Sequence, residues 1–151
     1  MRGNVIQTAF DDFMKSLGFS KKSGSWYRTS DDVVSVVELQ RSQYGPWYYV
    51  NLAAWLRALG EEKAPKEHKC HMRTRLDNLV GAGEARLTSL LDLEVAMPDA
   101  ERRSMLTEFL REHLRPALDA MSSLEALHAP EGQKMVALSV VTGPARQLLK
   151  V

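Results

Sequence analysis

The sequence predicts an α+β fold in a single domain over residues 1–151: an antiparallel β-meander of three or four strands, an N-terminal helix, and a helical C-terminal half packed on the sheet. Two runs at residues 33–41 and 47–56 are rich in β-branched and aromatic residues. Tyr44-Gly45-Pro46 separates them, which is typical of a β-hairpin. Apolar residues at helical spacing precede this hairpin and return after Pro98.

Hydrophobic patterning predicts the register of the hairpin. Side chains alternate across a strand, so pairing Arg41 with Tyr48 gathers the apolar residues of both strands on one face. A slip of one residue would bury the carboxylate of Glu38 without a partner, which is costly. The pairs that follow are Val33 with Leu56, Val34 with Trp55, Val37 with Leu52, Glu38 with Asn51, Leu39 with Val50, and Gln40 with Tyr49.

The chain before the hairpin predicts a helix, a turn and a strand. Apolar residues at helical spacing predict the helix over residues 5–17, and Gly18 followed by Phe19 is typical of a Schellman ending. Residues 21–24 predict a solvated turn. Residues 25–29 predict a short first strand, which makes the sheet a three-strand meander.

The chain after the hairpin changes character twice. Residues 57–69 are polar and predict an exposed, mobile loop. Residues 70–76 alternate again, which favours a fourth strand, although a helical stripe also fits their end. Residues 84–95 fit either period, so their structure stays open.

Helices dominate the rest of the prediction. Pro98 opens the longest one, which Pro116 must kink or divide because proline lacks the amide hydrogen. Ser122 and the glutamate three residues later resemble a capping box that starts a further helix. After an interruption at residues 130–132, the tail fits two short helices, and its valines leave a strand open as the alternative.

Composition narrows the class of protein. Lys+Arg 20 against Asp+Glu 19 leave a formal net charge of +1, which argues against a dedicated nucleic-acid binder. Cys70 is the only cysteine, so no internal disulfide can form, and a reducing cytoplasm is the expected location. Neither a signal peptide nor a membrane-spanning stretch is predicted.

Several motifs together resemble one known family. They are Leu17-Gly18-Phe19, Trp26-Tyr27-Arg28, Val36-Val37-Glu38-Leu39-Gln40-Arg41-Ser42, Tyr49-Val50-Asn51-Leu52, Cys70-His71-Met72-Arg73-Thr74-Arg75-Leu76 and Ser122-Ser123-Leu124-Glu125-Ala126-Leu127. In combination they resemble the bacterial family known as domain of unknown function 4304, over residues 5–127. The resemblance supports the architecture and leaves the function open.

One face of the predicted sheet mixes polar and aromatic side chains. The guanidinium groups of Arg73 and Arg75, about 7 Å apart along the fourth strand, are suited to bind a phosphate or a carboxylate. Two plainer interpretations stay open. In one, the arginines pair with Glu38, Asp92 or Glu94. In the other, the long helix after Pro98 covers the row of Trp47, Tyr49 and Trp55, which then forms a second core layer. The candidate binding residues on this face are Glu38, Gln40, Tyr49, Asn51, Trp55, His71, Arg73 and Arg75.

Catalytic and metal sites have weaker support in the sequence. Adjacent residues of a strand point to opposite faces, so Cys70 and His71 do not form a nucleophile–base pair there. We expect Cys70 to be buried on the apolar face. His68, Cys70 and His71 are too few ligands for a metal site, because the sequence shows no second cluster of ligands. No catalytic residue, metal or cofactor is predicted.

Two functional hypotheses remain. The preferred one is a non-enzymatic cytoplasmic binding module whose polar-aromatic face binds a protein partner or a small anionic ligand, with an immunity or antitoxin-like role as one form. The alternative is an enzyme acting on a phosphate-bearing or nucleotide substrate, with Arg73 and Arg75 as anion clamp, Glu38 as base and His71 as acid. A deep pocket joining Glu38 to His71 would favour the enzyme, and an open face would favour the binding module.

Overall fold

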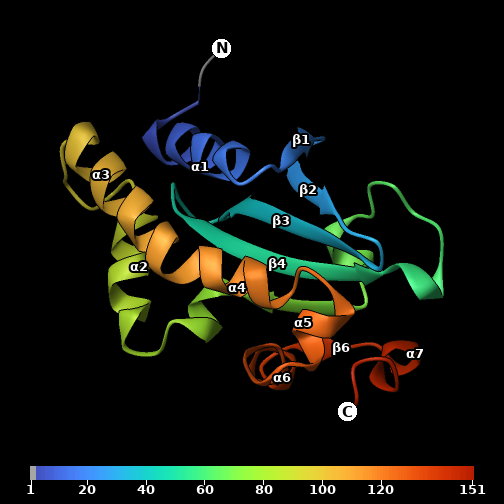
Figure 1. Ribbon diagram of the computed structural model, residues 1–151. Helices are drawn as coiled ribbons and strands as arrows, with labels where there is room; N and C mark the ends of the chain where they lie inside the picture. Colours follow the sequence, from blue (N-terminus) through green and yellow to red (C-terminus); the bar gives the residue numbers. More distant parts are fainter. Residues whose placement is uncertain (1–2) are drawn as a thin grey trace.

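The computed structural model describes residues 3–151, in which six antiparallel strands form one sheet in chain order (Figure 1). The predicted three or four strands are too few. The two additional strands lie at the sheet edges and are only three and two residues long, so neither shows the alternation that reveals a strand in a sequence. The strands are β1 (Ser20–Lys22), β2 (Ser25–Thr29), β3 (Val33–Arg41), β4 (Tyr48–Leu56), β5 (Met72–Arg75) and β6 (Val140–Val141).

Helices precede and follow the sheet, as predicted. The first is capped by Asn4, whose side chain accepts a hydrogen bond from the amide of Gln7. It ends at Gly18 with φ 85°, and the amide of Phe19 returns to the carbonyl of Met14, as in a Schellman ending. The α-helices are α1 (Val5–Ser16), α2 (Glu84–Leu90), α3 (Asp99–Phe109), α4 (Arg115–Ala120), α5 (Leu124–His128), α6 (Pro130–Ala137) and α7 (Gly143–Arg146). In residues 3–151 no helix has the length and apolar character needed to cross a membrane.

The register predicted for the hairpin is confirmed at every pair. β3 and β4 pair from Val33 opposite Leu56 to Arg41 opposite Tyr48, with Glu38 opposite Asn51 between them. β5 continues the sheet with Asn51 opposite Arg75. Three polar residues from three neighbouring strands therefore lie in one row across the sheet.

The main hydrophobic core lies on one face of the sheet. Val37 and Leu52 are fully buried there together with Phe10 of α1, Leu106 of α3 and Leu118 of α4. Figure 1 shows α1, α3 and α4 lying across the sheet. Because α3 and α4 belong to this core, the interpretation that the long helix covers the aromatic row on the other face is wrong.

The other face carries a small apolar cluster and, beside it, polar side chains. The cluster contains Val34, Val36, Ala53 and Cys70. Cys70 is buried as predicted, but on the face opposite Met72, which belongs to the main core. The prediction failed because the strand begins at Met72 and strand alternation does not extend back to Cys70.

The polar segment between β4 and β5 is more ordered than the exposed loop predicted over residues 57–69. It contains the 3₁₀ turns η1 (Arg57–Leu59) and η2 (Glu67–Lys69), and Glu67 is only 7% exposed. Further on, η3 (Leu76–Leu79) and η4 (Gly81–Gly83) lead into α2. The ambiguous residues 84–95 are thus helical over residues 84–90, and Asp92 forms an isolated β-bridge with Trp47. The predicted turn at residues 21–24 is also shorter, because Lys21 and Lys22 lie in β1.

Proline determines the course of the C-terminal helices. Before Pro116 the long helix widens into a π-helical turn, Leu110–Leu114, and the amide of Arg115 reaches back to the carbonyl of Leu110. This turn divides α3 from α4, in agreement with the prediction. Pro130 opens α6 at its first position instead of interrupting the chain, because the missing proline amide has no helical partner there.

The predicted cap of the next helix needs correction. The cap of α5 is Ser123, whose hydroxyl accepts from the amide of Ala126, whereas Ser122 donates to the carbonyl of Asp119. In the tail, where helix and strand were both left open, the valines form the short strand β6 between α6 and α7.

Arg102 of α3 is a buried cation inside the helical layer. Its side chain is 2% exposed, and it donates hydrogen bonds to the carbonyl oxygens of Ser89, Leu90 and Val95. These carbonyls lie at and beyond the C-terminal end of α2, where the helix dipole favours a positive charge. Arg102 therefore fixes α2 and the following loop to α3.

Candidate functional site

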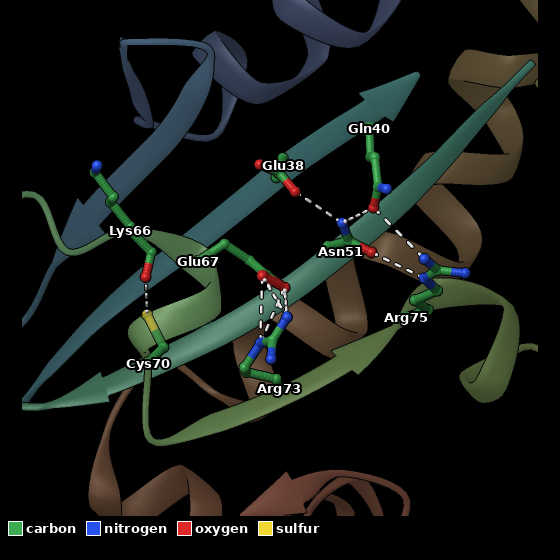
Figure 2. Close-up of polar contacts among 8 residues, drawn as sticks. All are labelled: Glu38, Gln40, Asn51, Lys66, Glu67, Cys70, Arg73 and Arg75. Carbon is green, nitrogen blue, oxygen red and sulfur yellow. Dashed lines mark hydrogen bonds and ion pairs between the residues drawn. The ribbon is translucent and has the colours of Figure 1, made fainter. Parts of the chain in front are cut away.

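A polar cleft lies on the sheet face opposite α3 and α4. Its volume is about 560 Å³, and it contains five of the eight predicted site residues. These five come from β3, β4 and β5, and Figure 2 shows Glu38, Gln40 and Arg75 turned toward Asn51 and Arg73 turned toward Glu67. The cleft is lined by Glu38, Gln40, Asn51, Glu67, His68, Arg73, Thr74, Arg75, Asn78, Leu138 and Val140.

Asn51 is the centre of the hydrogen-bond network in the cleft. Its amide nitrogen donates to Glu38 Oε1 and to Gln40 Oε1, both at 2.8 Å. Its amide oxygen accepts from Arg75 Nε at 3.1 Å. With a side chain 5% exposed and both of its amide hydrogens in use, Asn51 holds Glu38, Gln40 and Arg75 in fixed relative positions (Figure 2).

Arg75 is a cation held by neutral groups. Besides Asn51, its Nη2 approaches Gln40 Oε1 at 3.5 Å, and its guanidinium carbon lies 4.4 Å from the centre of the Tyr49 ring. Within the described residues 3–151, no ion pair involves Arg75. The predicted pairing with Glu38 or with the later acids is therefore wrong for this arginine. Its charge is oriented toward the cleft and is not neutralised by a carboxylate.

Arg73 differs from Arg75 because it has a carboxylate partner. Its Nε and Nη2 both bind the two carboxylate oxygens of Glu67, at 2.9 to 3.3 Å. The partner lies in η2 and is not among the acids that the sequence suggested. This forked ion pair attaches the segment between β4 and β5 to the sheet, as Figure 2 shows.

His71 and Trp55 lie outside the cleft lining and hold the chain beside it. The Nδ1 atom of His71 accepts the amide hydrogen of Leu56 at 2.9 Å, and the imidazole lies 4.2 Å from the Trp55 ring. Burial lowers the pKa of His71, so the ring favours its neutral form with the proton on Nε2. Trp55 in turn donates from its indole nitrogen to the carbonyl of Gly60 at 3.0 Å.

Cys70 also anchors this segment. The thiol is 2% exposed and donates to the carbonyl of Lys66 at 3.4 Å (Figure 2). Burial raises the pKa of Cys70 to about 12, so the reactive thiolate is suppressed. The arrangement is that of a structural cysteine and not of a nucleophile.

Residues that sequence reasoning missed complete the cleft. Glu67 and His68 were assigned to an exposed loop, and nothing in their local sequence indicates that η2 lies over the sheet. Thr74 was not among the candidate residues, yet it lines the cleft at the edge of β5 and donates to the carbonyl of Leu138 at 3.0 Å. Leu138 belongs to the tail, which the sequence did not place against the sheet.

The cleft presents both charged groups and groups that form hydrogen bonds. Glu38 accepts from Asn51, Arg73 is neutralised by Glu67, and Arg75 presents a cation. Glu38 and His71 do not meet in this cleft, because His71 does not line it. Within residues 3–151, the His, Cys, Asp and Glu side chains form no group of three suited to a metal ion.

Comparisons with known proteins agree with the resemblance found in the sequence. Neither the curated proteins nor the solved structures gave a match. A family model described as Domain of unknown function (DUF4304) matches residues 10–120. This match begins in α1, ends with α4 and includes β3, β4 and β5, which supply most of the cleft. The chain therefore belongs to the DUF4304 family.

Proposed function

We propose that this protein is a binding module that receives an anionic group at Arg75 in the polar cleft. The observation that supports the proposal is the environment of this arginine: Asn51, Gln40 and Tyr49 orient its guanidinium, and no carboxylate among residues 3–151 neutralises it. A forked guanidinium held in this way suits the two oxygens of a carboxylate or phosphate.

The surrounding groups define what the ligand carries beside its anionic group. The carboxylate of Glu38 accepts one hydrogen bond from Asn51 and retains capacity for others. It repels a second negative charge, so a hydrogen-bond donor or a positive group fits next to it. A ligand with an anionic group and a neighbouring N–H donor is therefore complementary to the cleft.

Preorganisation by Asn51 favours binding. The amide fixes Nε of Arg75 before the ligand arrives, so less side-chain freedom is lost on binding. Hydrogen bonds to a charged group contribute about 1.5–3 kcal/mol each. A simple inorganic anion should therefore bind weakly, and a ligand that also contacts the rest of the cleft should bind more tightly.

Thermal melting with sodium phosphate tests the proposal. A ligand that binds only the folded state stabilises it by about 2.7 kcal/mol at one hundred times its dissociation constant. The melting temperature of the wild type should rise with phosphate above that in sodium chloride of equal ionic strength, and Arg75→Gln should abolish this difference. Arg111→Gln removes an exposed arginine outside the cleft and should leave it intact.

Two outcomes would contradict anion binding at Arg75. One is a wild type that melts at the same temperature in phosphate and in chloride. The other is a phosphate response that Arg75→Gln retains in full. Arg73→Gln serves as a further comparison, because it should lower stability without phosphate by leaving the buried Glu67 without its partner.

A further inference from the structure

Two further cavities adjoin the polar cleft. One, of about 290 Å³, shares Glu38, Glu67 and His68 with it and extends over β2 toward Lys22. The other, of about 330 Å³, shares only Leu138 with it and lies between α4 and α6. We name the three adjoining cavities together the long groove. They occupy more of the surface than a single phosphate or carboxylate requires.

The long groove has charged and polar walls on the sheet side. Between α4 and α6 apolar residues, Pro116, Ala117, Ala120 and Met135, line it beside the charged residues Glu112, Glu131 and Lys134. Leu138 and Val140 are 53% and 72% exposed, which makes them two of the most exposed large apolar side chains in the described chain. Apolar side chains exposed beside a charged cleft are typical of an interaction surface.

The position of Leu138 relative to Arg75 is fixed by short contacts. The hydroxyl of Thr74 holds the carbonyl of Leu138 at 3.0 Å, and Thr74 is the neighbour of Arg75 in β5. β6 pairs with β5 at Met72 and Arg73, and the residue two before β6, Leu138, lies against Thr74. An anion site and an exposed apolar site therefore lie close together.

We infer that the ligand of the long groove is an extended peptide segment of a partner protein, with an acidic side chain at Arg75 and an apolar side chain against Leu138. This inference rests on the proposed function, since it specifies the class of ligand that carries the anion. An extended chain rises about 3.3 Å per residue, which places the two side chains about two to four residues apart. Its backbone N–H groups supply the donors that Glu38 accepts, and its length matches the groove.

Selection of peptides by the wild-type protein tests the inference. Phage-displayed random heptapeptides are selected on the immobilised protein, and the enriched peptides are synthesised with a fluorophore for polarisation measurements. We expect an enriched pattern with Asp or Glu and a large apolar residue two to four positions apart. Arg75→Gln should weaken binding about 10-fold or more, and Leu138→Ser about 5-fold, because Leu138 buries only part of its surface.

A double-mutant cycle makes the assignment specific. Replacing the acidic residue of the peptide by its amide should weaken binding to the wild type but not to Arg75→Gln, because both changes remove the same contact. Leu138→Ser should instead keep full sensitivity to the acidic residue. Arg111→Gln should bind every peptide as the wild type does.

The results separate this inference from the proposed function. If no heptapeptide is enriched while phosphate still stabilises the wild type through Arg75, the peptide inference is wrong and anion binding remains. If enriched peptides bind equally to wild type, Arg75→Gln and Leu138→Ser, the inference is also wrong. If neither peptide nor phosphate responds to Arg75, both fail together.

Discussion

Replacing Asn51 by aspartate tests the geometry of the whole cleft with a change of one group. The substitution Asn51→Asp keeps the shape of the side chain and the oxygen that accepts from Arg75. It replaces the nitrogen that donates to Glu38 and Gln40, each at 2.8 Å, by a second oxygen. Two hydrogen bonds become contacts between acceptors, and one of these contacts joins two carboxylates.

The expected loss of stability at pH 7 is about 2–3 kcal/mol. Two hydrogen bonds contribute about 1 kcal/mol each. Two like charges about 4 Å apart repel by about 4 kcal/mol at an effective dielectric constant of 20, and attraction to Arg75 at a similar distance offsets most of this. For a domain of this size such a loss lowers the melting temperature by about 5–10 °C.

The loss should depend on pH in a defined direction. In the folded state Arg75 lowers the pKa of the introduced carboxyl group and largely offsets the opposite effect of Glu38, so burial is the remaining cause that raises this pKa above its unfolded value of about 3.9. A raised pKa of an acid destabilises the folded state above that pKa, and the penalty disappears as the pH falls to the unfolded value. The stability difference between wild type and Asn51→Asp should therefore shrink between pH 7 and pH 4.

Urea denaturation at pH 7 and pH 4 measures this difference, and Gln40→Glu provides the matched control. That substitution also adds a carboxylate beside Asn51, but it keeps an oxygen where Asn51 and Arg75 donate. It should cost less than about 1 kcal/mol. Equal losses for the two variants, or a loss for Asn51→Asp that does not change with pH, would refute the hydrogen-bond directions assigned to Asn51.

Three further predictions concern the surroundings of the cleft and the helical layer. Arg102→Met should lower the free energy of unfolding by about 2 kcal/mol or more in urea titrations, because it leaves buried carbonyls of α2 without donors, and an unchanged midpoint would contradict this role. Cys70 should react with iodoacetamide at pH 8 only at the rate of global unfolding, since burial raises its pKa to about 12, whereas Cys70→Ala should fold and bind phosphate normally. Burial lowers the pKa of His71 below its usual 6.5, so stability present above pH 6.5 should be lost as the pH falls, and urea midpoints at pH 8 and pH 5 should differ less for His71→Asn than for the wild type.

Much of the central sheet could be predicted from the sequence because its determinants are local. Alternation of apolar and polar residues in β3 and β4 allows only one register without a buried, unpaired carboxylate. That register by itself places Glu38 opposite Asn51. The Schellman ending at Gly18 and the division at Pro116 likewise depend on residues within one turn of each other.

The sequence did not determine which residues approach the sheet from distant parts of the chain. Glu67 pairs with Arg73 because η2 folds back over β5, and this depends on the path of a polar segment without periodicity. Leu138 reaches the cleft because β6 adds to the sheet edge; the valines of the tail suggested a strand as an alternative, but not the edge at which it pairs.

Arg73 and Arg75 show most clearly what the sequence determines and what only the tertiary structure determines. Their spacing in the sequence places both side chains on one face of β5, and this much was predicted. Alternation specifies the side of a strand on which a residue lies, but not which groups from other elements meet it there. The tertiary structure brings a carboxylate to Arg73 and only neutral partners to Arg75, because η2 lies over one and Asn51, Gln40 and Tyr49 surround the other.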